Sequence, residues 1–203
     1  MEISSQDRAR VSTAIRAAET RSSGEIVCVL AQSSADSMAL AIMVAALLAL
    51  ALPWLLVGLT SLPVQQILWL QLALFLCLVA LACLPRVRGA LLPQATRRAI
   101  AHRAAMEQFL LRGIGRTRGR TGVLIFVSLA ERYARIIADE AIASRVPQSE
   151  WQGAIDALVE HMRNGRMADG FVEAIERCGA VLAAHFPRQE TDRDELPDRL
   201  YLV

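Results

Sequence analysis

An uncharged stretch of 49 residues limits what this chain can fold into. Residues 37–85 contain no Asp, Glu, Lys, Arg or His, although charged residues make up 21% of the 203-residue chain. A helix needs about 20 apolar residues to cross the hydrocarbon core of a bilayer, and residues 38–58 and 66–84 each supply such a segment. A short turn with Pro63 separates them. The stretch therefore predicts a transmembrane hairpin of two helices, rather than a hairpin buried in the core of a soluble protein.

Arginine residues flank the predicted hairpin on both sides. All 22 basic residues of the chain are Arg, and several lie shortly before residue 37 and shortly after residue 85, whereas the turn between the two spans is uncharged. Basic residues next to membrane spans mark the cytoplasmic side of the membrane. We therefore expect a multi-pass protein that has the lipid bilayer as a partner and both termini in the cytoplasm.

Outside the hairpin, the sequence predicts one α/β domain built from two pieces of chain. The pieces are residues 1–36 and 86–187, and an acidic C-terminal tail follows over residues 188–203. We expect this tail to be mobile up to residue 198, and we expect residues 200–203 to dock back on the domain. Without the uncharged stretch 154 residues remain, which is enough for one ordinary domain. The domain is thus predicted to fold around an inserted membrane hairpin.

Helix and strand patterns alternate along the polar pieces. Residues 4–22 predict a helix capped by Ser4 or Ser5, and the continuous apolar run 25–31 predicts a buried strand. After the hairpin, residues 93–112 predict a further helix. Its apolar face is expected to carry Ala99, Met106 and Leu110.

Two more strands and two amphipathic helices complete the predicted domain. Residues 122–129 predict a buried strand, and residues 132–138 predict a third strand after a turn so short that the two must pair as a hairpin. Strands one and two are separated by a helix, so we expect them to be parallel. Amphipathic helices follow, beginning near Trp151 and Phe171. These patterns together predict an α/β fold with a mixed sheet.

Several segments of the two pieces occur in an order that is found in a known family. The segments are Gly24-Glu25-Ile26-Val27, Arg120-Thr121-Gly122-Val123-Leu124-Ile125-Phe126-Val127-Ser128, Glu131-Arg132-Tyr133-Ala134-Arg135-Ile136-Ile137-Ala138-Asp139, and the helix starts at Trp151 and at Gly170-Phe171. Their order resembles the TPM domain family, named for thylakoid, photosystem-repair and nematode membrane members, in a bacterial variant with a membrane hairpin. The resemblance implies a three-layer α/β/α sandwich, here interrupted by the two-helix hairpin. It also implies acid phosphatase activity, and divalent-ion binding in some members.

Acidic residues at the strand ends are the candidate metal ligands. Asp36 follows strand one and Glu131 follows strand two near Ser128, so these side chains are expected at one edge of the sheet, facing the membrane. Asp139 matches an acidic position of the family but follows strand three, which runs back. It is therefore expected at the opposite edge, without a metal shared with Glu131. Carboxylates of this kind suit Ca²⁺ or Mg²⁺. The alternative is that the first edge is a solvated loop with a capping Ser and that Asp139 caps a turn or helix.

Arginines form the candidate anion-binding surface. Residues 86–120 carry nine Arg and one acid, whereas residues 131–203 carry nine Arg and 14 acids. Arginine close to a bilayer attracts anionic lipid at about 1 kcal/mol per residue. The candidates for anionic lipid or phosphate are Arg97, Arg98, Arg132 and Arg135. The basic loop before the second strand lacks interleaved aromatic residues, so nucleic acid is not an expected partner.

Two functions remain after these observations. The favoured one is a non-enzymatic integral protein of the bacterial inner (cell) membrane, with a cytoplasmic TPM-like domain that acts through protein or lipid contacts at the membrane surface. We also expect a protein partner, which the sequence does not identify. The alternative is a divalent-cation-dependent phosphatase with Glu131, Asp139 or Asp36 on the metal and Arg132 or Arg135 on the phosphate. The cofactor of this alternative is Ca²⁺ or Mg²⁺.

Overall fold

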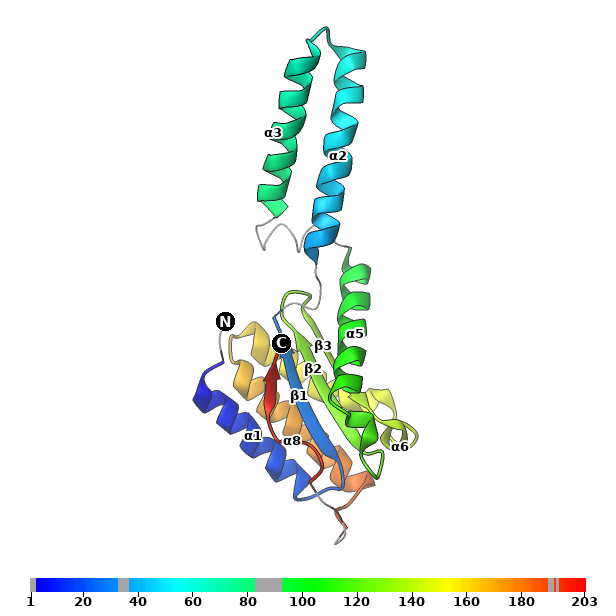
Figure 1. Cartoon of the computed structure of the whole chain (residues 1–203). Coiled ribbons are helices and arrows are strands. Elements are labelled where there is room, and N and C mark those ends of the chain that lie inside the picture. The colour runs from blue at the N-terminus through cyan, green and yellow to red at the C-terminus, as the bar shows by residue number, and fades with distance from the viewer. Residues whose placement is uncertain (1–2, 33–36, 83–92, 190–191, 193) are drawn as a thin grey trace. The chain divides into compact units, whose positions relative to one another are not determined.

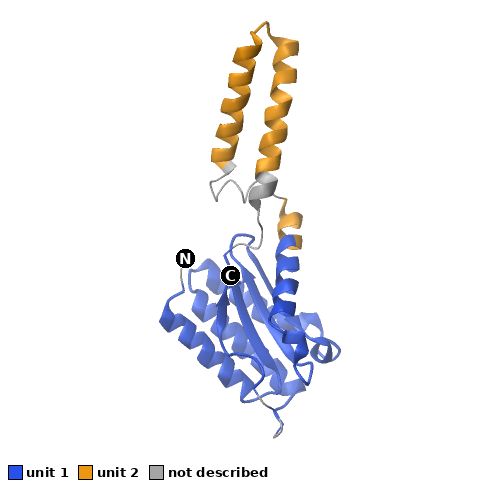
Figure 2. Ribbon diagram, in the orientation of Figure 1, with its two compact units in different colours: residues 1–34, 100–203 blue, residues 35–99 orange. Residues whose placement is uncertain are grey.

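Residues 3–32, 37–82, 93–189, 192 and 194–203 are described by the computed structural model of the protein. The chain consists of two compact units (Figure 2). The first comprises residues 1–34 and 100–203, and the second comprises residues 35–99. The predicted Asp36 site lies outside the described residues.

A mixed sheet lies at the centre of the first unit (Figure 1). In the described residues it has four strands, β1 (Glu25–Ala31), β2 (Gly122–Ser128), β3 (Tyr133–Ala138) and β4 (Leu200–Leu202), in the order β3-β2-β1-β4. Strand β1 is parallel to β2 and to β4, and β2 is antiparallel to β3. The predicted parallel pair and the predicted hairpin are both confirmed.

Helices cover both faces of this sheet, which gives the predicted three-layer α/β/α arrangement (Figure 1). One face packs on α1 (Ser5–Glu19), α7 (Gln152–Arg163) and α8 (Met167–His185), and the other face packs on α5 (Gln94–Leu111). The short helical segments are η1 (Ile114–Arg116), α6 (Glu140–Ala143) and η2 (Gln148–Trp151).

Burial on both faces explains why β1 and β2 are continuous apolar runs. Successive side chains of a strand point to opposite faces, and both faces of these strands are covered. In β1, Cys28 joins the core on the α1 and α8 side, and Val29 joins the core that contains Phe109 of α5. Every residue of β1 and β2 is therefore buried.

The sequence-based prediction of which face of α5 is buried is wrong. The buried residues of α5 are Ala101, Ala105 and Phe109. The residues that were expected to be buried are exposed, namely Ala99, Met106 and Leu110. The prediction followed the larger apolar side chains, whereas α5 contacts the sheet through two small alanines and one aromatic ring.

Two apolar helices, α2 (Ser37–Leu59) and α3 (Val64–Ala82), lie in the second unit, which also includes the first residues of α5. They pack against each other, and Ala45, Ala49 and Ile67 are their buried residues among those described. In the part of the chain that the structure describes, these two helices are long and apolar enough to cross a membrane. They correspond to the two segments that the sequence predicts.

Gly122 at the start of β2 leaves no room for a side chain. A Cβ atom there would lie 2.5 Å from Ile114 Cγ2 and would also press on the carbonyl oxygen of Ile114, which is fully buried. We expect Gly122→Ala to destabilise the first unit by about 1–3 kcal/mol, because backbone and core must shift. Thermal unfolding of the full chain in detergent, followed by near-UV circular dichroism, measures this.

Gly153→Ala is the matched control for this substitution. Gly153 is exposed at the start of α7, and among the described atoms its Cβ would contact only the end of the Arg177 side chain, Nη1, at 3.4 Å. Alanine favours a helix over glycine by about 1 kcal/mol, so the control should be neutral or stabilising. Equal melting temperatures for the two variants would contradict the expectation.

Candidate functional site

A cleft of about 840 Å³ lies at the edge of the sheet where β1 and β2 begin. Its walls come from the end of α1, the segments before β1 and β2, the end of α8 and the C-terminal segment. The charged side chains that matter for its chemistry are Arg16, Glu19, Glu25, Arg188, Asp194 and Asp198. Ligands of open α/β sheets usually bind at the opposite edge, where parallel strands end.

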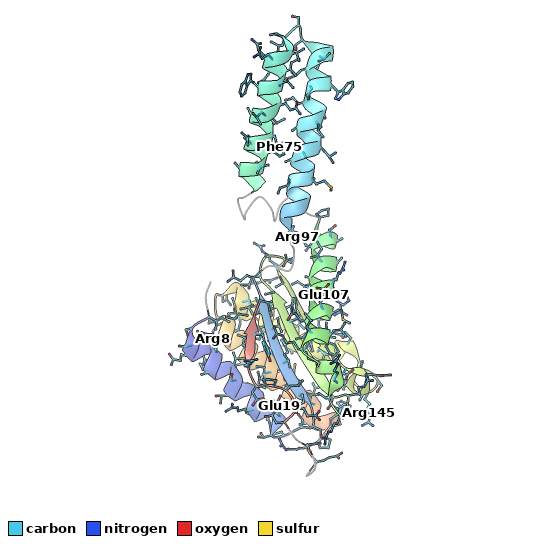
Figure 3. All side chains as sticks on the ribbon, viewed as in Figure 1. Arg8, Glu19, Phe75, Arg97, Glu107 and Arg145 are labelled. Carbon is cyan, nitrogen blue, oxygen red and sulfur yellow. The ribbon has the colours of Figure 1, made fainter. Side chains whose placement is uncertain are left out.

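Glu19 connects the end of α1 to the beginning of β1 (Figure 3). Its side chain is buried, and its Oε1 atom accepts a hydrogen bond of 2.8 Å from the backbone N–H of Ile26. Arg188 Nη1 donates to the Glu19 carbonyl oxygen at 2.7 Å. The backbone N–H of Ile26 thus holds the carboxylate of Glu19, and the Arg188 side chain holds its backbone carbonyl.

Glu25, the first residue of β1, holds the C-terminal segment. Its buried carboxylate accepts hydrogen bonds from the backbone N–H groups of Glu195, at 3.3 Å, and Leu196, at 3.1 Å. These contacts direct the following residues into β4 beside β1. A buried carboxylate that accepts backbone hydrogen bonds is better stabilised than one left without partners.

Asp198, in the C-terminal segment, has a largely buried side chain. Its side chain is only 8% exposed, and its Oδ2 atom accepts a hydrogen bond of 2.9 Å from Arg16 Nε. Its buried Oδ1 atom has no hydrogen-bond partner among the described residues. One carboxylate of the cleft is therefore only half satisfied.

Burial raises the pKa of Glu19 to about 9, with the nearby carboxyl of Asp198 and the charge of Glu25 as further causes. Burial also raises the pKa of Glu25, although its two backbone hydrogen bonds oppose the shift. Like charges that are close together and poorly hydrated favour the protonated form of one of them. At neutral pH the cleft therefore holds a proton on Glu19.

The expectation of a mobile tail up to residue 198 is wrong for the described part of that tail. Glu195, Leu196 and Asp198 contact the domain through the hydrogen bonds above. The expected docking of residues 200–203 is confirmed, because Leu200–Leu202 form β4. The acidic composition predicted a solvated segment, but specific partners on α1 and β1 hold it.

The structure places the predicted metal ligand Glu131 beside Ser128, at the end of β2. The Ser128 hydroxyl donates a hydrogen bond to the Glu131 carboxylate. Whether this pair binds a cation stays a prediction.

Asp139 lies at the other end of β3. Its N–H donates to the carbonyl of Gly122, at the start of β2, and its Oδ1 accepts from the N–H of Glu140 as the N-cap of α6. The predicted capping alternative is thus confirmed. Strand β3 has six residues and spans about 20 Å, so Asp139 and Glu131 lie at opposite ends of this strand.

The four candidate arginines lie on different elements. Arg132 is exposed in the turn before β3 and has a positive φ of 52°. Arg135, on β3, lines a smaller cavity of about 230 Å³ together with His102 and Trp151. Arg97 and Arg98 lie in the first turns of α5.

The sequence reasoning missed the cleft residues Glu19, Glu25 and Asp198. Glu19 and Glu25 lie on either side of the connection between α1 and β1, and each is an acid next to an apolar run. An acid at the end of an apolar run could have indicated a functional carboxylate at the edge of the sheet. Asp198 carried no such signal, because only the pairing of β4 with β1 brings it to the cleft.

The fold defines this chain as an α/β/α sandwich protein with an inserted pair of apolar helices. Residues 90–181 match the family model of the TPM domain. A similar solved structure is the NMR structure of BA42 protein from the psychrophilic bacterium Bizionia argentinensis, with a TM-score of 0.63 and 20% identity over 100% of this chain and 97% of that chain. No curated protein matches the chain. The segment 90–181 is therefore similar to the TPM domain, whereas the acids of the cleft lie outside the matched segment.

The raised pKa of Glu19 predicts a pH-dependent stability. The folded chain holds this proton up to about pH 9, whereas the ordinary pKa is 4.5, so the folded state binds more protons between these values. The stabilisation is complete below pH 4.5 and falls as the pH rises toward 9, by at most about 1.4 kcal/mol per pH unit. Glu19→Gln keeps an acceptor for Ile26 N–H and should remove most of this slope.

The pH dependence that Glu19 is expected to cause is tested by melting temperatures of the full chain in detergent and EDTA, measured between pH 5 and pH 9. The variant should gain stability over the wild type as the pH rises. Glu160→Gln, at an exposed position of α7, should follow the wild type. An unchanged slope in Glu19→Gln would show that Glu19 does not hold the proton.

Proposed function

We propose that the chain is an integral protein of the bacterial inner membrane, whose TPM domain lies in the cytoplasm and acts through contacts with lipid headgroups or a partner protein at the membrane surface. The observation that carries this proposal is the exposed apolar surface of α2 and α3. Trp54 is 85% exposed, Leu47 is 61% exposed and Trp69 is 66% exposed. Apolar surface of this extent marks contact with a membrane or with another protein.

The contact between α2 and α3 is also of the kind that membrane helices use. Ala45 and Ala49 are four residues apart on α2 and are buried. Small residues at this spacing let helix backbones approach closely in lipid. The larger side chains point outward, which suits a surrounding of lipid chains rather than water.

The two tryptophans lie at matching depths in the hairpin. Trp54 is five residues before the end of α2, and Trp69 is five residues after the beginning of α3. At 1.5 Å per residue both lie about 7.5 Å from the turn. Tryptophan is enriched at membrane interfaces, so this arrangement supports an interface close to the turn. The arginines that flank the hairpin then favour the cytoplasm for the other side.

This topology predicts which positions an external reagent reaches. Ser61, in the turn between α2 and α3, and Ser149, on the TPM domain, are both exposed. In intact spheroplasts a membrane-impermeant maleimide should label Ser61→Cys and should leave Ser149→Cys unlabelled until the membrane is permeabilised. The wild-type chain gives the background from its own cysteines. Labelling of Ser149→Cys in intact spheroplasts would overturn the cytoplasmic assignment.

A lipid contact predicts a role for the first turns of α5. In vesicles that contain phosphatidylglycerol, backbone amides of residues 94–105 should exchange more slowly than in phosphatidylcholine vesicles. Arg97→Glu together with Arg98→Glu should abolish the difference, because reversed charges repel anionic headgroups. Hydrogen exchange followed by mass spectrometry measures this.

The control for this experiment is the double reversal Arg163→Glu and Arg166→Glu, at exposed positions around the end of α7. It should keep the lipid dependence. If the wild type shows no difference between the two lipids, contact with headgroups is excluded and contact with a partner protein remains.

The alternative function, a divalent-cation-dependent phosphatase, has less support. The family that matches carries phosphatase in its name. However, Glu131 and Asp139 lie at opposite ends of β3, so these two carboxylates do not form a joint metal centre.

A further inference from the structure

We infer that Glu19, Asp194 and Asp198 bind one divalent cation in the cleft at the edge of the sheet where β1 and β2 begin. This site is separate from the predicted ligands Glu131 and Asp139, and it does not depend on the proposed membrane function.

The spacing of the three carboxylates fits a single ion. Each of them offers one oxygen atom, and these atoms lie within 4.8 Å of one another. Oxygen ligands lie about 2.3–2.6 Å from Ca²⁺, so two ligands on opposite sides of the ion are separated by about 4.8 Å. One ion can therefore contact all three side chains. Asp194 is exposed, which leaves the remaining coordination positions open to water.

An unpartnered buried oxygen provides a second and independent observation. Oδ1 of Asp198 is buried without a hydrogen-bond partner in the described part of the chain, although the other oxygen of this carboxylate is bound by Arg16. A buried acceptor without a partner costs about 1–3 kcal/mol, and more when it is charged. A cation in the cluster would satisfy this oxygen.

The charge of the cleft also requires a counter-charge. Glu19, Asp194 and Asp198 lie together, and Glu25 is a further buried acid nearby. In the described part of the chain, Arg16 contacts the carboxylate of Asp198, and Arg188 contacts the carbonyl oxygen of Glu19. A bound cation would supply this counter-charge between the three carboxylates.

The ligands come from segments that are far apart in the sequence. Glu19 ends α1, whereas Asp194 and Asp198 precede β4. A bound ion would therefore fasten the C-terminal segment to α1. This adds to the hydrogen bonds that Glu25 already makes with the same segment.

Calorimetric titration of the full chain in detergent tests the site, with CaCl₂ and MgCl₂ as the probes after removal of ions by chelation. We expect saturable binding of one ion per chain. Asp198→Asn should abolish binding, and Asp194→Asn should weaken it at least about tenfold, since each removes a charged ligand. Asp156→Asn, at an exposed acid of α7, should bind as the wild type does.

Asp194→Asn is the decisive variant, because Asp198→Asn also removes the ion pair with Arg16. Near-UV circular dichroism verifies that each variant is folded. Glu19→Gln should also weaken binding, because it removes the third charged ligand of the cluster.

Two results would overturn the inference. One is the absence of saturable binding of either ion up to about 10 mM. The other is binding with the same affinity in the wild type, Asp194→Asn and Asp198→Asn, which would place the ion elsewhere on the chain.

Discussion

The parallel pairing of β1 with β2 holds together the two pieces of the α/β domain. Glu25 pairs with Gly122 and Ala31 with Ser128, so the register joins segments that are separated by the whole apolar hairpin. The entropy cost of closing a long connection grows only with the logarithm of its length. The pairing, with both strands buried between helices, therefore tolerates a long insertion after β1, and the domain core does not depend on the length of the inserted segment.

The same pairing determines where acidic residues gather. Strand β1 begins at Glu25, directly after the end of α1, and β4 runs parallel to it on its other side. The beginning of β1, the end of α1 and the segment before β4 must therefore meet at one edge of the sheet. Each contributes a carboxylate at this edge, and their burial together produces the raised pKa of Glu19. The opposite edge carries the Ser128–Glu131 pair, so the two ends of the sheet differ in chemistry.

Local chemistry made much of the fold predictable. Apolar runs predicted β1, β2 and β3 to within a residue or two, and the Ser4 and Asp139 caps follow from side chains that bond to nearby N–H groups. The buried face of α5 did not follow, because close packing on the sheet selects small alanines over larger apolar side chains. The cleft was also missed. Asp198 reaches it only because β4 pairs with β1, and the acidic composition of the C-terminal segment had predicted that this segment is solvated.

The pairing of β4 with β1 has a consequence for the biosynthesis of this chain. Cys28 pairs with Leu200, so the ribosome makes more than 160 residues, including the apolar hairpin, between the two partners. Until β4 emerges, one side of β1 carries unpaired N–H and C=O groups, which is a template for association with other chains. Closure of the sheet is therefore a late event in the synthesis of the domain, and a nascent chain that stalls before residue 200 presents an open strand to its neighbours.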